Sequence, residues 1–471
     1  MRLSGHDASF LYAETASSAM HSIAFIELED APSFEELYNY YAARIHLIPR
    51  LRQKLAFVPF GVAHPKWVDD PAFDLSNHIK SHRVPEGTSL TDAIDIAMNL
   101  GEPLLDRTRP LWLFYILENV EGRTLVAQMT HHAFVDGATL VAISTVLTDA
   151  SPNADQPEPA PPWEPEPVPS DFALWQEGVA EQAATAVSSL QRPPPTPAMT
   201  RKVGDLLARL TLPVMQAPWN AGLVGPKRQL TCLQYQLEDF RGIRHSLGGT
   251  VNDVALACVV EAAARYMAFM GENTSRHQLR IMCPVNIRGE EDDPLNMGGN
   301  KVSGLFPVLS ATQSSMQERY EEVLSEMQGI KEREEAETIH YLRESQPPVP
   351  LPAIPGVGTS LDPSLLAARI PTFIIPNYGF RPQQSGNNFT FTNVFGPPYT
   401  QYVAGHRVTK MYGSLMLGGN LGLGISLNSY GEQFTFSFTA DPRLVKRLDK
   451  FRDLVAASFA ELQQVAHEAR D

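Results

Sequence analysis

The clearest chemical potential in the sequence belongs to two adjacent histidines, His131 and His132, in the segment QMTHHAFVDGATL (128–140). Asp136 follows the second histidine by four residues, and Gly137 comes directly after the aspartate. An imidazole titrates near neutral pH, so a histidine can take a proton from a hydroxyl group and later return it. The segment therefore predicts general acid–base chemistry in which one of the two histidines is the base.

The elements around these histidines indicate which one that is. Residues 124–132 have the composition of a strand, in which neighbouring side chains point to opposite faces. His131 then ends an apolar face, whereas His132 ends a largely polar face made by Thr124, Val126, Gln128 and Thr130. We expect the polar face to line a channel or cleft. His132 is therefore the catalytic candidate, and His131 is expected in the core.

Asp136 lies where the strand ends and the apolar run GATLVAISTVL begins a helix. Its carboxylate is expected to cap that helix or to meet a buried cation, and Gly137 permits a tight entry into the helix. A His-x-x-x-Asp match alone arises by chance in many proteins, but the doubled histidine, the glycine and the strand–turn–helix context favour a functional site. The sequence has no G-x-S-x-G elbow and no P-loop. A lone histidine suits general-base catalysis, in which it takes a proton from an acceptor hydroxyl or amine during attack on an activated acyl group.

Composition excludes several other classes of protein. The 471 residues are 43% hydrophobic and 19% charged, as in an ordinary globular protein, and the length favours two large domains. A formal net charge of −15 argues against a nucleic-acid partner. The three cysteines lack metal-binding spacing, so we expect reduced structural thiols and no metal site. The N-terminal segment lacks the pattern of a secretory signal, which predicts a cytoplasmic protein.

Hydrophobic periodicity predicts an alternation of strands and helices in both halves of the chain. We expect an N-terminal domain over 1–150, a connector over 151–225 and a C-terminal domain over 226–471. The connector begins with a proline-rich acidic stretch (151–170), which favours an extended path, and continues with helical segments at 171–190 and 201–223. Further strands are expected at 21–30, 110–131, 228–237, 278–288 and 424–441, and further helices at 32–48, 89–100, 252–270, 312–338 and after 441. Residues 347–376 are expected to form a proline-rich loop region.

A series of short motifs resembles the bacterial wax ester synthase/diacylglycerol acyltransferase family, within the wider acyl-CoA-dependent acyltransferases that carry His-His-x-x-x-Asp-Gly. Their order and approximate spacing fit over nearly the whole chain. The motifs are DASFLYAE (7–14), MH (20–21), PLW (110–112), HHAFVDG (131–137), TVNDV (250–254), PVNIR (284–288), GN (299–300) and NVFGPP (393–398). The family's Pro-Gly-Pro-like turn is altered here by Phe395, which leaves the acyl pocket and its chain-length preference open.

The resemblance implies an α/β fold of two domains, like chloramphenicol acetyltransferase, with mixed sheets, flanking helices and a tunnel between the domains. It implies that His132 is the general base and that Asp136 orients the loop, with Arg288 as a buried ion-pair partner. Asn252 and Asp253 match a second functional motif, although capping of the following helix explains them as well. Gly299 and Asn300 are expected to shape a turn beside the channel. Trp112 suits the core or the channel wall.

The implied reaction is acyl transfer from a long-chain acyl-CoA to a fatty alcohol or a diacylglycerol, without a covalent intermediate, metal or cofactor. Two other readings remain: a condensation-type relative that uses carrier-bound substrates, and a non-catalytic lipid-body protein. An amphipathic segment, DLLARLTLPVM (205–215), near Arg201, Lys202 and Arg209, is expected either to lie at a membrane or lipid-inclusion surface or to pack on the protein itself. The sequence predicts no particular oligomeric state.

Overall fold

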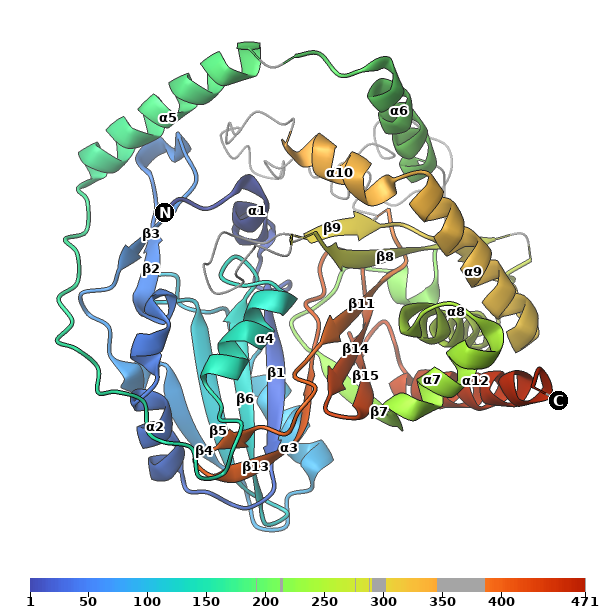
Figure 1. Ribbon diagram of the computed structural model, residues 1–471, viewed down its shortest axis with the longest axis horizontal. Helices are drawn as coiled ribbons and strands as arrows, with labels where there is room; N and C mark the ends of the chain where they lie inside the picture. The colour runs from blue at the N-terminus through green and yellow to red at the C-terminus, as the bar shows by residue number, and fades with distance from the viewer. Residues whose placement is uncertain are drawn as a thin grey trace.

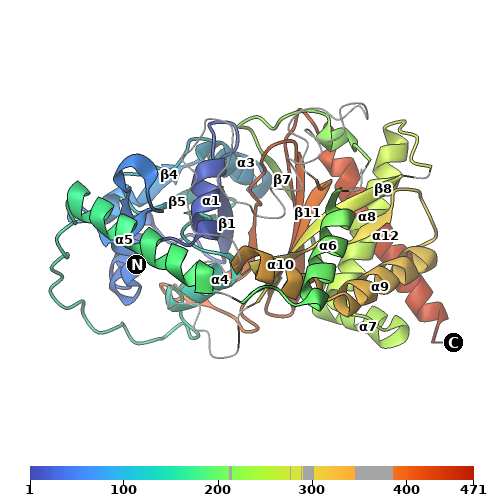
Figure 2. The ribbon, with the colours of Figure 1, turned by 90° about the horizontal axis from the view of Figure 1, so that it is seen from above.

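The computed structural model describes residues 1–191, 193–211, 215–275, 277–287, 289, 302–344 and 386–470. Two sheet-containing halves lie side by side, and a long connector runs over one end of both (Figures 1 and 2). The described helices are α1 (Gly5–Ala13), α2 (Phe34–Ala42), α3 (Leu90–Leu100), α4 (Gly137–Val146), α5 (Asp171–Gln191), α6 (Pro197–Thr211), α7 (Leu237–Leu247), α8 (Val251–Phe269), α9 (Met316–Glu332), α10 (Glu335–Glu344) and α12 (Leu448–Glu468).

The described strands form two large mixed sheets and one small one. The first sheet has the order β12-β13-β1-β6-β5-β4; the second has the order β10-β8-β11-β14-β15-β7, with β9 beside β8; and β2 pairs with β3. Their bounds are β1 (His21–Leu28), β2 (Gln53–Ala56), β3 (Lys66–Asp69), β4 (Ile79–Arg83), β5 (Trp112–Val120), β6 (Arg123–His131), β7 (Gln229–Gln236), β8 (Gln278–Asn286), β9 (Val302–Leu305), β10 (Val308–Ser310), β11 (Phe389–Phe395), β12 (Tyr402–Val403), β13 (His406–Gly413), β14 (Leu423–Tyr430) and β15 (Gln433–Ala440).

Most of the predicted elements are present, and their ends follow the local signals. Ser89 caps α3 by accepting a hydrogen bond from the amide of Asp92, and the turn between β5 and β6 falls at Glu121 and Gly122, both with positive φ. The single long helix expected at 312–338 is wrong. The chain divides there into α9 and α10, because Glu334 adopts a left-handed conformation (φ 52°) that an α-helix cannot contain. The proline-rich region expected at 347–376 lies outside the described residues.

One strand pairing crosses the predicted division of the chain into two domains. Strands β12 and β13 come from residues 402–413, yet β13 pairs with β1 and so completes the first sheet. The range 226–471 therefore supplies strands to both halves of the molecule. Sequence periodicity identifies a strand but not its partner, because pairing depends on contacts with residues far away along the chain.

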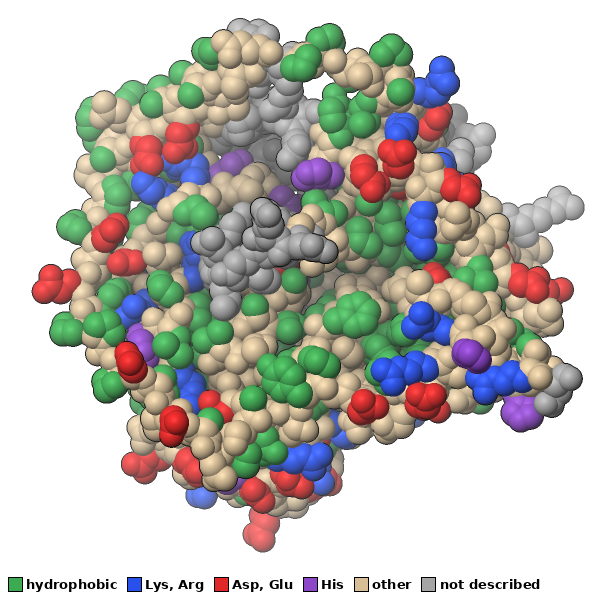
Figure 3. Space-filling view, viewed as in Figure 1, with side chains coloured by type: hydrophobic (Ala, Val, Ile, Leu, Met, Phe, Trp, Pro, Cys, Tyr) green, Lys and Arg blue, Asp and Glu red, His purple; other side chains and the backbone are tan. Residues whose placement is uncertain are grey.

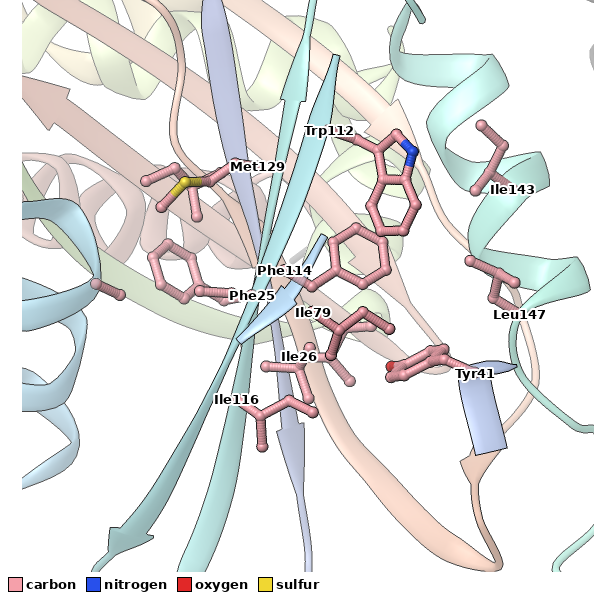
Figure 4. Close-up of a cluster of buried hydrophobic side chains, with 14 of the residues drawn as sticks. Phe25, Ile26, Tyr41, Ile79, Trp112, Phe114, Ile116, Met129, Ile143 and Leu147 are labelled. Atoms are coloured by element: carbon pink, nitrogen blue, oxygen red, sulfur yellow. The ribbon is translucent and has the colours of Figure 1, made fainter. Parts of the chain in front are cut away.

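The face of β6 that was expected to line a channel is closed over most of its length. Thr124, Gln128 and Thr130 are each less than 5% exposed. Figure 4 shows why: Trp112, Phe114 and Tyr41 lie on this side of the first sheet, together with Ile143 and Leu147 from the α4 region, while Phe25 and Met129 lie on the other side. The polar groups are satisfied internally, as when Thr124 donates its hydroxyl hydrogen to the carbonyl of Pro32 (3.0 Å). Both faces of β6 are thus core, and at the histidine end the first partly exposed residue is His132, directly after the strand.

One face of the second sheet packs in the core of its own half, and the opposite face is directed toward the first half of the molecule. Phe389 and Phe391 of β11, with Ile425 and Leu427 of β14, are fully buried in the same core cluster as residues of α8 and α12. The intervening side chains are small or polar, and they point the other way (Thr390, Thr392 and Val394 on β11; Gly424, Ser426 and Asn428 on β14). This alternate face is the one that α4 approaches from the first half.

No single helix among the described residues has the length and apolarity needed to cross a membrane. Helices α7 and α8 pass a length and composition test only when taken together, and they meet at a bend of 94°.

Candidate active site

The HHAFVDG segment forms a turn between the end of β6 and the start of α4. The amide of His132 donates to the carbonyl of Met20 (2.8 Å), which extends the pairing of β6 with β1 by one residue. The amide of Phe134 then donates back to the carbonyl of His131 (2.9 Å), and the chain turns into the helix. The MH and HHAFVDG motifs are therefore in direct contact.

His131 is fully buried and belongs to the framework of the site, as the strand argument predicted. Its Nδ1 accepts a hydrogen bond from the amide of Ala133 (2.9 Å). Because Nδ1 is an acceptor, the ring hydrogen is assigned to Nε2, and that nitrogen lies 3.3 Å from Oε1 of Glu14. The imidazole therefore links the turn to the end of DASFLYAE.

Glu14 is a site residue that the sequence interpretation did not single out. Its carboxylate is 1% exposed and accepts hydrogen bonds from the amide of Met20 (3.0 Å) and from Arg107 (2.9 Å). Burial alone would raise the pKa of Glu14, but the close contact with the His131 imidazole and the hydrogen bonds from Met20 and Arg107 together lower it to about 2. Glu14 is thus an ionised anchor that holds three segments together. Arg107 also donates to the carbonyl of Leu11 (2.7 Å).

His132 points away from this anchor, and its side chain stays partly exposed. The ring packs on Phe10 of α1, with centroids 5.0 Å apart, and Phe10 in turn packs against His6 at 5.2 Å. Burial, with smaller contributions from His131 and His6, lowers the pKa of His132 to about 4, while Asp136 acts in the opposite direction. The imidazole is therefore neutral at pH 7, which is the form a general base requires.

One side of α1 packs over the two histidines. His6, Phe10 and Glu14 follow one another at intervals of four, so they share one side of α1 and its C-terminal end. That side covers both histidines. The sequence does contain a signal for this side of α1, because His6, Phe10 and Glu14 follow an i, i+4 pattern. Nothing in the sequence indicates which segment that side of the helix contacts.

Asp136 is the N-cap residue of α4, as predicted. It is 3% exposed, and its Oδ1 accepts a hydrogen bond from the amide of Thr139 (2.9 Å). Its expected partner Arg288 lies outside the described residues, as do Gly299 and Asn300. The pairing with Arg288 therefore stays a prediction.

Gly137 is explained by close packing across the two halves. A Cβ atom added at Gly137 would lie 3.3 Å from Cγ2 of Val394, which projects from the alternate face of β11. The site therefore lies between the first half, which supplies the histidines, and the wall formed by β11. Phe395 is 65% exposed and follows Val394 at the end of β11, so alternation directs it to the opposite side of the strand. It is not part of this wall.

The second motif, TVNDV, begins α8. Asp253 is 4% exposed, and its Oδ2 accepts hydrogen bonds from both the amide and the hydroxyl of Thr250 (2.8 Å each), while the amide of Asp253 donates to that hydroxyl. This reciprocal capping box agrees with the structural interpretation of Asp253. Asn252 occupies the first turn and is partly exposed.

Trp112 and the three cysteines are structural. Trp112 is 1% exposed, donates from Nε1 to the carbonyl of Leu51 (2.8 Å) and stacks on His78, so it belongs to the core. Burial raises the pKa of Cys232 to about 12 and also raises those of Cys258 and Cys283, so none of the three thiols is a ready nucleophile. Among the described residues, no group of His, Cys, Asp and Glu has the arrangement of a metal site.

Known proteins share this architecture. A wax ester synthase/diacylglycerol acyltransferase from Marinobacter aquaeolei VT8 superposes with a TM-score of 0.69 over 99% of this chain and 100% of its own, at 19% identity. The first condensation domain of the calcium-dependent antibiotic synthetase superposes with a TM-score of 0.60 over 98% of this chain and 97% of its own, at 14% identity. The fold is thus the two-domain acyltransferase fold that the resemblance implied.

Sequence comparison identifies the family. Residues 3–255 match the wax ester synthase/diacylglycerol acyltransferase catalytic domain, and residues 298–463 match the WS/DGAT C-terminal domain. A Mycobacterium tuberculosis protein whose name proposes diacylglycerol O-acyltransferase activity is 26% identical over 99% of this chain and 97% of its own length. The site and fold define an acyltransferase. The chain belongs to the wax ester synthase/diacylglycerol acyltransferase family.

Proposed function

We propose that this acyltransferase moves a long-chain fatty acyl group from acyl-CoA to the hydroxyl group of a diacylglycerol or a fatty alcohol. The observation that carries the proposal is the placement of His132: a partly exposed imidazole at the junction of the two halves, where Gly137 packs against Val394. Burial lowers the pKa of His132 to about 4, which favours the neutral form at pH 7. The names of the relatives support acyl transfer to diacylglycerol and to wax alcohols as the two acceptor classes.

In the proposed mechanism His132 removes the hydroxyl proton as the acceptor oxygen attacks the thioester carbonyl. A new ester bond forms, the C–S bond breaks, and the proton passes from His132 to the departing thiolate to give free CoA. An alcohol is too weakly acidic to ionise by itself at neutral pH, and base assistance of this kind contributes about 10²–10⁴-fold. Placement of both substrates between the halves supplies further acceleration. The mechanism uses no covalent acyl-enzyme, no metal and no cofactor.

Within this mechanism Asp136 and His131 act on the position of His132 and not on the substrate. Asp136 fixes the start of α4 on one side of the turn, and the contact of His131 with Glu14 fixes the other side. The turn that carries the catalytic ring is thereby fixed at both ends by buried carboxylates. A loosely held base would lose much of the benefit of proximity.

The test is acceptor-dependent release of CoA thiol from palmitoyl-CoA, with hexadecanol or a diacylglycerol as acceptor. The wild-type protein should release thiol only when an acceptor is present, and the His132→Ala variant should not. His82→Ala, which removes a partly exposed imidazole from β4, is the matched control and should keep full activity. Folded wild-type protein that released no thiol with either acceptor would contradict the proposal and favour a specialised acceptor or a non-catalytic role.

A further inference from the structure

Helix α5 has an inverted amphipathic arrangement. Two of its three acidic side chains pair with basic residues of the first half: Glu177 pairs with Lys66 (2.7 Å) and Glu181 pairs with Arg2, while Asp171 in the first turn is exposed. Gly178 lies between them against the segment after β2, where an added Cβ atom would come within 2.9 Å of Ala63. The inward side of the helix is therefore attached by charge and by close backbone packing.

The outward side of α5 is apolar and solvent-exposed. Six exposed apolar residues recur at helical spacing along it, with Gln176 among them: Phe172, Val179, Ala180, Ala183, Ala186 and Val187. The exposed charged residues of the helix, Asp171 and Glu181, lie outside this stripe. Phe172 is 69% exposed, Val187 55% and Val179 41%. A helix on the surface of a globular protein normally has the reverse arrangement, with its apolar stripe against the core and its charges outward.

A second apolar feature lies beside this stripe. The 3₁₀ turn η3 (Pro59–Gly61) contacts α5 and projects Phe60, which is 90% exposed and has a left-handed backbone conformation (φ 59°). Phe57 on the same segment is 45% exposed. We name the surface formed by the outward stripe of α5 together with Phe57 and Phe60 the α5 face.

The other connector helix shows that this arrangement is particular to α5. Leu206 and Leu210 of α6 are buried against Phe306 and Ile339, and Arg209 pairs with Glu326 (2.7 Å) and Glu335. Segment 205–215 was one expected site of lipid contact, but its described part, the end of α6, packs on the protein itself. Its apolar side has a partner among the described residues, whereas the outward stripe of α5 faces solvent.

The α5 face lies on the outer side of the connector, at one end of the molecule. The connector, with α5 and α6, arches over the end of the molecule at which α1 and α10 lie (Figure 1). Figure 3 shows hydrophobic side chains along the outer edge of this arch and acidic and basic side chains on its inner edge. A flat apolar partner seated on the α5 face would lie at this same end of the molecule, on the outer side of the arch.

We propose that the α5 face docks on an electrically neutral lipid surface. The exposed apolar side chains can enter the boundary between headgroups and acyl chains, as interfacial helices do. The outward stripe carries no Lys or Arg, and the nearby basic residues Arg2 and Lys66 are already paired with glutamates, so attraction to anionic lipid is not the driving force. The choice of a lipid partner rests on the proposed function, whose donor and acceptor are both long-chain lipids.

The experiment is flotation of the purified full chain with phosphatidylcholine vesicles, in the absence of any substrate. The test variant is Phe60→Glu/Phe172→Glu, and a milder one is Val179→Glu/Val187→Glu on the stripe alone. The matched control is Leu223→Glu/Phe269→Glu, which changes two apolar side chains that are each 53% exposed elsewhere. Each aromatic removed should lower the partition coefficient by about 10-fold or more. The control should bind as the wild type does, and vesicles with anionic phosphatidylglycerol should not bind the protein more tightly.

Three results would overturn the proposal: wild-type protein that does not float with phosphatidylcholine, equal loss of binding in test and control variants, or a dimer in sedimentation velocity that only the test variants disrupt. The last result would identify a second copy of the chain as the partner. Vesicle binding is measured without catalysis, so it stands apart from the acyltransferase assay. In that assay the test variants should lose transfer to vesicle-borne diacylglycerol and retain transfer to a short, water-dispersed alcohol.

Discussion

Helices α4 and α8 both begin at a short loop that carries an aspartate, one in each half of the molecule. Asp136 caps α4 from the N-cap position, and Asp253 caps α8 from the third helical position in a capping box with Thr250. In both cases a buried carboxylate accepts backbone hydrogen bonds that the first helical turn leaves unsatisfied. The sequence motifs HHAFVDG and TVNDV therefore share one piece of local chemistry.

The difference lies in what surrounds each loop. The α4 loop carries His132, and α1 packs on it so that Phe10 and Glu14 contact the two histidines. The α8 loop follows Gly248 and Gly249, both with positive φ, and is held by the hydroxyl of Tyr320, which donates to the carbonyl of Gly248 (2.7 Å). Equal capping chemistry thus supports the proposed catalytic base in one half and the start of a core helix in the other.

The difference between the α4 loop and the α8 loop is tested most directly by replacing His132. Replacing His132 by Ala should lower kcat by about 10²–10⁴-fold, because the base is lost. The melting temperature should stay close to that of the wild type, since the side chain is partly exposed. His131→Ala should show the opposite balance, with loss of stability as the main effect, because it removes a buried link to Glu14. A folded but inactive His131→Ala with an active His132→Ala would reverse the assignment.

Asp136→Asn sharpens the comparison by preserving the cap and removing the charge. Asn is about as good an N-cap residue as Asp, so the cap by itself should survive. If the predicted ion pair with Arg288 exists, the free energy of unfolding should fall by about 3–5 kcal/mol, because one buried charge loses its partner. Chemical denaturation measures this difference, and an unchanged midpoint would exclude the pair.

Glu14→Gln tests whether the α4 loop depends on its anchor. A neutral amide cannot accept from Arg107, Met20 and His131 in the same way, so the turn should shift and kcat should fall by up to about 10²-fold, with a smaller change in KM. Glu27→Gln, at a carboxylate of β1 that is 2% exposed, is the matched control and should leave kcat unchanged. An equal loss of kcat in both variants would show a general effect of buried carboxylates instead.

The pH profile of the wild type follows from the lowered pKa of His132. The base is active when neutral, so kcat/KM should stay constant from pH 8 down to about pH 5 and fall about 10-fold per pH unit only below the pKa of about 4. If His132 had the pKa of an exposed imidazole, kcat/KM would begin to fall at about pH 6.5. A measured fall of kcat/KM at that higher pH would mean that the His132 ring is fully solvated in the working enzyme.

The smallest effect is expected at Asp253. Asp253→Asn should weaken the capping box and lower the free energy of unfolding by about 1 kcal/mol, with kcat unchanged. This variant separates the two loops: a loss of kcat at equal stability would give Asp253 a role in catalysis and end the contrast with Asp136.

Much of the local structure could be predicted from the sequence. Alternation along β6 separated His131 from His132, the Ser89 cap placed the start of α3, and the apolar run after Gly137 predicted α4. The order of the motifs also identified the family. These signals are readable because they depend on residues within a turn or two of one another, where period and capping chemistry decide the outcome.

Three features required the folded chain: the contact between Glu14 and His131, the crossing of β13 into the first sheet, and the outward turn of the apolar side of α5. Each joins residues far apart in the sequence, or depends on what covers a surface. Periodicity shows that a helix or strand has two unlike sides. Only the tertiary structure decides what each side meets, because that depends on packing against distant segments.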